Sequence, residues 1–110
     1  MKNDLIYLKH IRDSINDIDE AIAGTTYEQF LENKILLKAV VRDLEIIGEA
    51  AGKISLEFRD ANMQIPWRDM IDMRNVLIHE YFGVIPETVW KTCTENLPEL
   101  KTTVDELLSE

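Results

Sequence analysis

The chain has 110 residues, of which 45% are hydrophobic and 30% are charged, a length and composition that suit one globular domain and exclude a disordered chain. Acidic residues outnumber basic residues by 21 to 12, for a formal net charge of -9, which excludes a surface that attracts nucleic acid or anionic membranes over its whole area. No stretch is apolar enough for a signal peptide or a membrane span, and we expect one cytoplasmic domain over residues 1–110.

Residues 3–23 have the period of an amphipathic helix. Their apolar side chains recur at alternating spacings of three and four. Gly24 can end this helix, and Thr26 is a candidate N-cap for the next one. His10 belongs to no motif, and we expect it to face solvent.

Residues 27–54 are expected to form a second, longer helix with two apolar faces. The first face consists of Phe30, Leu37, Val40, Val41, Leu44, Ile47 and Ala51. The second, nearly opposite, consists of Ile35, Ala39, Ile46 and Ala50. A helix of this kind lies at the centre of a bundle or is shared between a core and a subunit interface.

A polar stripe lies between these two faces. Lys38, Arg42 and Glu45 have the spacing of ion pairs on a solvated helix surface, and we assign them no other role. Glu49 continues the same stripe toward the end of the helix. It is therefore a candidate partner for a cation on a neighbouring helix.

Residues 55–65 have no strong period and predict an irregular connection or a short turn of helix. Pro66 and Trp67 then open a third helix, because proline suits the first helical turn. No helix breaker follows through Tyr81, and Gly83 ends the helix.

A fourth helical period runs from Pro86 to the C-terminus. Pro98 falls inside it, so we expect a kink or a restart there, with Asn96 as a candidate cap. Cys93, the only cysteine, lies on the apolar stripe and is interpreted as a small buried hydrophobe. The predicted fold is all-α: an antiparallel four-helix bundle with a candidate extra short helix and a kinked C-terminal helix.

The third helix carries the most distinctive residues, Arg74, Asn75, His79 and Tyr81. On a helical wheel Arg74 falls among apolar side chains, whereas Asn75 and His79 share a neighbouring polar stripe. A buried guanidinium requires an anionic or carbonyl partner, and Glu49 is the candidate within the chain. Two interpretations of Arg74 are open at this point. It forms an ion pair with Glu49 that has a purely structural role, or it belongs to a functional site.

His79 beside Arg74 suits acid–base chemistry without a metal or a cofactor, since the sequence contains no metal-ligand set, no nucleophile motif and no phosphate-binding glycine loop. Cleavage of RNA fits, because imidazole can move the protons while a guanidinium stabilises the phosphorane. The two side chains are about 140° apart on a straight helix. We therefore expect a homodimer whose two copies share one cleft.

The pattern Arg74-x4-His79-x-Tyr81, with LEIIGEAA at residues 44–51 and NLPEL at residues 96–100, resembles the HEPN superfamily and in particular its HepT-like (DUF86) branch. The resemblance implies a homodimeric helical toxin of a type VII-like toxin–antitoxin pair. Arg74 and His79 would be the catalytic pair of a metal-independent endoribonuclease. A minimal nucleotidyltransferase would be the antitoxin and would attach AMP to Tyr81.

Asn75 and Glu49 are expected to support that site. Relatives often have a basic residue after the asparagine, where this chain has Val76 and Leu77, which removes a phosphate contact. Two other hypotheses follow from the acidic charge and the buried arginine. One is a non-catalytic nucleotide-binding or scaffold subunit that pairs with a nucleotidyltransferase. The other is a helical dimerisation module in which Arg74 only bridges to Glu49.

Overall fold

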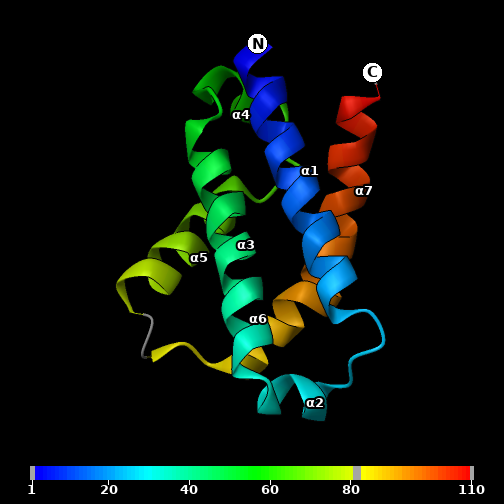
Figure 1. The fold of residues 1–110 in the computed structure, drawn as a ribbon. Helices are drawn as coiled ribbons and strands as arrows, with labels where there is room; N and C mark the ends of the chain where they lie inside the picture. Colours follow the sequence, from blue (N-terminus) through cyan, green and yellow to red (C-terminus); the bar gives the residue numbers. More distant parts are fainter. Residues whose placement is uncertain (1, 81–82, 110) are drawn as a thin grey trace.

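The computed structural model describes residues 2–80 and 83–109, and its regular elements are helices. They are α1 (Lys2–Ile22), α2 (Tyr27–Glu32), α3 (Lys34–Lys53), α4 (Leu56–Ala61), α5 (Trp67–His79), α6 (Pro86–Lys91), the π-helical turn η2 (Thr92–Asn96) and α7 (Leu97–Leu108). α1 packs between α3 and α7 and runs antiparallel to both, and α5 packs against α3 (Figure 1). The prediction of an all-α helical bundle is confirmed.

The core is built from the predicted apolar faces of the long helices. Its members include Leu8, Ile11, Ile15 and Ile18 of α1, Val40, Leu44, Ile47 and Ala51 of α3, and Leu97, Leu100 and Val104 of α7. The second apolar strip of α3 is divided: Ala50 is buried, whereas Ile35 is 81% exposed. This division arises because α5 crosses α3 at Gly48 and leaves the first turns of α3 uncovered. No helix within the described ranges has the length and apolarity needed to cross a membrane.

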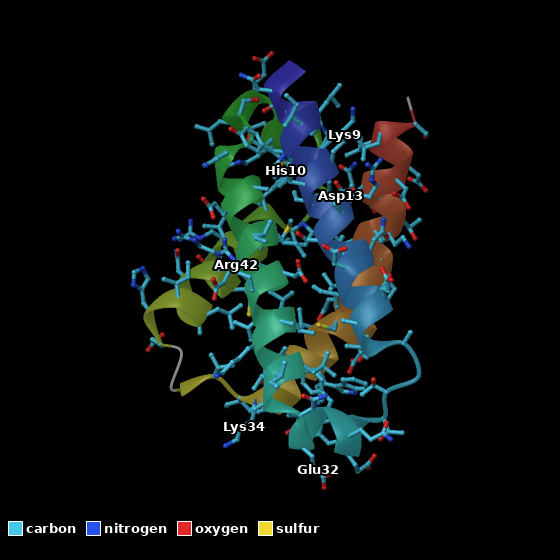
Figure 2. The ribbon with its side chains drawn as sticks, viewed as in Figure 1. Lys9, His10, Asp13, Glu32, Lys34 and Arg42 are labelled. Atoms are coloured by element: carbon cyan, nitrogen blue, oxygen red, sulfur yellow. The ribbon has the colours of Figure 1, made fainter. Side chains whose placement is uncertain are left out.

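The helix predicted over residues 27–54 is interrupted at Asn33, so the prediction of one continuous helix was wrong. The Asn33 side-chain oxygen accepts a hydrogen bond from the Leu36 N–H at 3.0 Å and thereby caps α3. Figure 2 shows Glu32 and Lys34 on either side of the break. Asparagine favours such a break because its side chain competes for backbone hydrogen bonds that a helix would otherwise use.

The turn between α1 and α2 follows the predicted signals. Gly24 has a φ of 74°, in the left-handed region that glycine adopts without steric cost. Thr26 Oγ1 accepts from the Gln29 N–H at 3.1 Å, and the Thr26 N–H donates to Gln29 Oε1 at 2.9 Å. The predicted N-cap is thus confirmed, as a reciprocal capping box.

The short connection after α3 contains α4, one of the two alternatives predicted for residues 55–65. Ser55 caps α4, since its Oγ accepts from the Phe58 N–H at 3.1 Å. The Ser55 N–H and Oγ–H donate in turn to the two carboxylate oxygens of Asp4, each at 2.8 Å. The carboxylate therefore ties the start of α4 to the start of α1.

Asp4 is only 3% exposed. Burial acts to raise the pKa of its carboxyl, but hydrogen bonds to the charged form, those from Ser55 among them, outweigh burial and lower the pKa below its ordinary value of 3.8. A pKa that is lower in the folded state than in the unfolded state contributes stability above the unfolded pKa. That contribution is lost as the pH falls through the folded pKa.

We expect Asp4→Ala to reduce the free energy of unfolding at pH 7 by about 1–2 kcal/mol, because two partly buried hydrogen bonds from Ser55 to this carboxylate are lost. Urea unfolding measures this loss, and the difference from wild type should shrink as the pH falls below the ordinary pKa of 3.8. Asp13→Ala is the control: this side chain is 65% exposed and pairs with the adjacent Arg12 at 3.2 Å. Equal losses in both variants would contradict the assigned role of Asp4.

The predicted restart near Pro98 is confirmed, because α7 begins at Leu97 and places Pro98 in its first turn. Asn96 occupies the N-cap position of α7, as predicted, but its side chain makes no capping hydrogen bond. The π-helical turn η2 joins α6 to α7. Cys93 lies in η2 and is 2% exposed. This low exposure confirms the predicted buried thiol. Burial, followed by the charges of Asp19 and Asp43, raises the pKa of Cys93 to about 12.

Candidate active site

The start of α5 is anchored by an aromatic contact and a hydrogen bond. Trp67 is 7% exposed, and its Nε1–H donates to the Asn62 carbonyl oxygen at 3.0 Å. Its ring meets Phe58 of α4 edge-on, with the ring centroids 6.3 Å apart. These contacts confirm Pro66 and Trp67 as the opening of the helix and fix where α5 leaves the connection.

Arg74 lies where α5 crosses α3, and the contact point on α3 is Gly48. A Cβ atom added to Gly48 would overlap the Arg74 Cβ and would lie 2.5 Å from the Met70 carbonyl oxygen. On either side of Arg74, Met70 and Leu77 are buried, and Arg74 itself is half-buried. The wheel therefore placed Arg74 correctly on the inner side of α5, whereas Ile78, predicted on the same side, is 39% exposed.

The polar atoms of Arg74 have few partners. Nη1 donates to the neighbouring Asn75 Oδ1 at 3.1 Å. Nε is buried and has no hydrogen-bond partner among residues 2–80 and 83–109. The candidate Arg74–Glu49 ion pair is not formed: Glu49 Oε1 lies 3.6 Å from Lys53 Nζ, one turn along α3. Lys53 and Glu49 are four residues apart on the same helix, so they can pair whatever the angle at which α5 crosses α3.

Asn75 and His79 lie on the neighbouring polar stripe of α5, and both are exposed. His79 is the last residue of the helix, which ends as the Glu80 N–H donates to the Val76 carbonyl oxygen at 2.9 Å. One chain therefore brings Arg74 and Asn75 into contact but does not aim Arg74 and His79 at a common point. Tyr81, the predicted modification site, lies outside the described residues.

Asn75 also borders a groove of about 560 Å³ between α4 and the first half of α5. Apolar side chains on its walls include Leu56, which is 70% exposed, and Met63, which is 79% exposed. Arg68, also on its wall, is paired with Asp72, with Nε and Oδ1 3.2 Å apart. Arg59 also lines the groove, where its guanidinium donates to the carbonyl oxygens of Ile54 and Gly52 at 3.0 and 2.7 Å.

The arrangement provides a charged donor group in Arg74 and an exposed imidazole in His79, the two functions that phosphodiester cleavage needs. Within the part of the chain that the structure describes, no three histidine, cysteine or acidic side chains are grouped to hold a metal ion. Gly48 lies within the LEIIGEAA segment at residues 44–51, but no role was predicted for it. A glycine inside a strong helical pattern is a usable signal, because it is unfavourable there unless packing requires it.

The chain is similar to known proteins over most of its length. A family model described as "Ribonuclease HepT-like" matches residues 11–107. "Putative RNase TTE0752" of Caldanaerobacter subterraneus subsp. tengcongensis is 40% identical over 110 residues, which cover 100% of this chain and 98% of that protein. "Putative RNase MJ1380" of Methanocaldococcus jannaschii is 40% identical over 99 residues, 90% of this chain and 91% of that protein.

"Probable ribonuclease HepT" of Thermococcus cleftensis is 45% identical over 95 residues, which cover 86% of each chain. No solved structure matches the chain. The region matched by the family model contains all the candidate site residues, namely Glu49, Arg74, Asn75, His79 and Tyr81.

Proposed function

This chain belongs to the ribonuclease HepT-like family, and on that premise we propose that it is a metal-independent endoribonuclease. The observation that supports the proposal most directly is on α5, where a half-buried arginine at position 74 and an exposed histidine at position 79 share one helix. Two of the relatives named above carry the description "Putative RNase" and the third "Probable ribonuclease". RNA is accordingly the proposed substrate.

The proposed reaction uses the 2'-hydroxyl of RNA as its nucleophile. Neutral His79 removes the 2'-hydroxyl proton while the 2'-oxygen forms a bond to phosphorus. Arg74 donates hydrogen bonds to the phosphorane oxygens, where negative charge accumulates. An imidazolium then protonates the 5'-oxygen as its bond to phosphorus breaks, which leaves a 2',3'-cyclic phosphate and a 5'-hydroxyl.

Asn75 and Glu49 are proposed to support the reaction. Asn75 already accepts a hydrogen bond from Arg74 Nη1 at 3.1 Å, so it limits the directions in which the guanidinium can point. Glu49 follows Gly48, on which Arg74 packs, and its exposed carboxylate is paired only with Lys53 at 3.6 Å within the described chain. A carboxylate at that place can pair with the Arg74 guanidinium once it releases Lys53.

A second copy of the chain is proposed to complete the site. Arg74 faces α3 whereas His79 faces solvent, so a single copy does not direct both side chains at one phosphorus. Val76 and Ile78 lie between them in sequence and are 44% and 39% exposed. Apolar side chains in this position suit a two-fold interface that would bring two copies of each polar residue together.

The proposed regulator is a minimal nucleotidyltransferase acting as antitoxin in the cytoplasm. It would transfer AMP to the phenolic oxygen of Tyr81, two residues after His79. The added phosphate would carry negative charge close to the site of RNA cleavage. Like charges repel, so the modified toxin would bind RNA poorly.

The alternative is a non-catalytic nucleotide-binding or scaffold subunit for the same kind of transferase. Two observations favour it. The net charge is -9, and two basic side chains near the motif, Arg68 and Lys53, are already paired with carboxylates at 3.2 and 3.6 Å. A protein of this kind would form a stable complex with the transferase. It would not cleave RNA.

Incubation of the purified, unmodified protein with RNA in EDTA tests the proposal. We expect cleavage products that end in a 2',3'-cyclic phosphate, at the same rate with and without the chelator. A mass spectrum after co-expression with a minimal nucleotidyltransferase of the proposed kind should show AMP on the peptide that contains Tyr81, together with loss of cleavage. A stable complex without any cleavage by the unmodified protein would contradict the proposal and support the scaffold alternative.

A further inference from the structure

We propose that Gly48 is a positioning residue for Arg74: the missing side chain lets α5 lie directly against α3 and confines the arginine stem to one direction. This inference rests on the proposed function, because it gives the arginine a catalytic task. It assigns to Gly48 no contact with RNA. Gly48 acts only through the side chain that packs on it.

The first argument is the closeness of the two helices. A Cβ atom at position 48 would overlap the Arg74 Cβ, would lie 2.5 Å from the Met70 carbonyl oxygen and would lie 3.1 Å from the Arg74 Cγ. Two of these three neighbours, the Cβ and the carbonyl oxygen, are fixed to the helix and cannot rotate away. Any residue other than glycine would therefore have to push α5 away from α3.

The second argument is the state of the guanidinium. Its Nε is buried without a hydrogen-bond partner among the described residues, an unfavourable arrangement for a charged group. Its Nη1 is held by Asn75 Oδ1 at 3.1 Å. The Arg74 side chain is thus restrained at its base by Gly48 and at its tip by Asn75. Packing, and not satisfaction of all its hydrogen bonds, determines where it points.

The expected consequence of adding a methyl group at position 48 follows from the geometry of catalysis. A displacement of about 1 Å in a group that stabilises a transition state can cost about 100-fold in rate. Gly48→Ala should therefore lower kcat for RNA cleavage by about 10- to 100-fold. The KM for RNA should remain within about twofold of wild type, because binding to the rest of the RNA is untouched.

Gly52→Ala is the matched control, one turn further along the same helix. The nearest atom to a Cβ at position 52 is Ile71 Cγ1 at 4.0 Å, an ordinary van der Waals distance. This variant makes the same change in side chain and in helix propensity without disturbing the crossing. Its kcat should equal that of wild type. Equal losses of kcat in the two variants would overturn the proposal.

A double-mutant comparison separates positioning from general damage to the fold. If Gly48 acts through the guanidinium, Gly48→Ala should lower single-turnover cleavage in the wild-type background and should have no further effect in an Arg74→Ala background. The effect of Gly48→Ala on thermal stability should persist in both backgrounds, because the Cβ of alanine at position 74 still overlaps the added methyl group. An undiminished effect on cleavage in the Arg74→Ala background would overturn the proposal.

A measurement on the wild-type protein does not depend on whether Gly48→Ala folds or on ribonuclease activity. The buried Nε–H of Arg74 should exchange with solvent more slowly, by nuclear magnetic resonance, than that of Arg68, whose side chain is 89% exposed. Exchange as fast as that of Arg68 would overturn the proposed restraint. Slow exchange in a protein that fails to cleave RNA would instead refute the proposed function and leave the restraint intact.

Discussion

His79→Ala is expected to lower kcat for RNA cleavage by about 10²–10⁴-fold, since the variant loses the group that moves the proton of the 2'-hydroxyl. His79 is exposed at the end of α5, so its removal should change the free energy of unfolding by less than about 0.5 kcal/mol. Cleavage rates measured under single-turnover conditions, together with urea unfolding, test both parts.

His10→Ala is the control for this experiment. His10 is exposed on α1 (Figure 2), as predicted, and it belongs to no motif. Its replacement should leave the cleavage rate unchanged. Undiminished cleavage by the His79 variant would contradict the assignment of His79 as the catalytic base. Equal losses in both variants would indicate a general effect on the protein.

Arg74→Ala is expected to lower kcat by about 10²–10³-fold, the effect seen when one donor to a developing oxyanion is removed. Arg74→Lys should restore little of this activity. Lysine keeps the methylene contact with Gly48 but presents a single ammonium in place of a planar group with several donors. Arg42→Ala is the control, because Arg42 has a 65% exposed side chain paired with Glu45 at 3.4 Å.

The competing interpretation of Arg74 gives a different result in the same experiment. If the arginine only joins helices, the alanine variant should lose stability while each folded molecule cleaves RNA at the wild-type rate.

The composite site is tested by mixing the Arg74→Ala and His79→Ala proteins. The mixture should recover cleavage that neither variant shows alone, because each protomer supplies the residue that the other lacks. No recovery, or a monomer in sedimentation of the wild type, would contradict the shared site.

The sequence alone determined those features that depend on neighbours along the chain. The spacing of Ile11, Ile15 and Ile18 predicted a buried helical face, and Thr26 predicted the start of α2. The wheel also separated Arg74 from His79, because the angle between two positions on one helix depends only on helical geometry. Asn33 and Ser55 were missed as caps, although their capping chemistry is equally local.

The tertiary structure decided the contacts between helices. A wheel gives the direction of a side chain but not the height at which another helix crosses it. For this reason it suggested Glu49 as the partner of Arg74, whereas the fold places Gly48 under the arginine and leaves Glu49 with Lys53. The crossing point depends on the anchoring of Trp67 and on the connection through α4. Helical periodicity therefore predicted that Arg74 lies on the inner side of α5 and His79 on an exposed stripe, and long-range packing determined what surrounds Arg74.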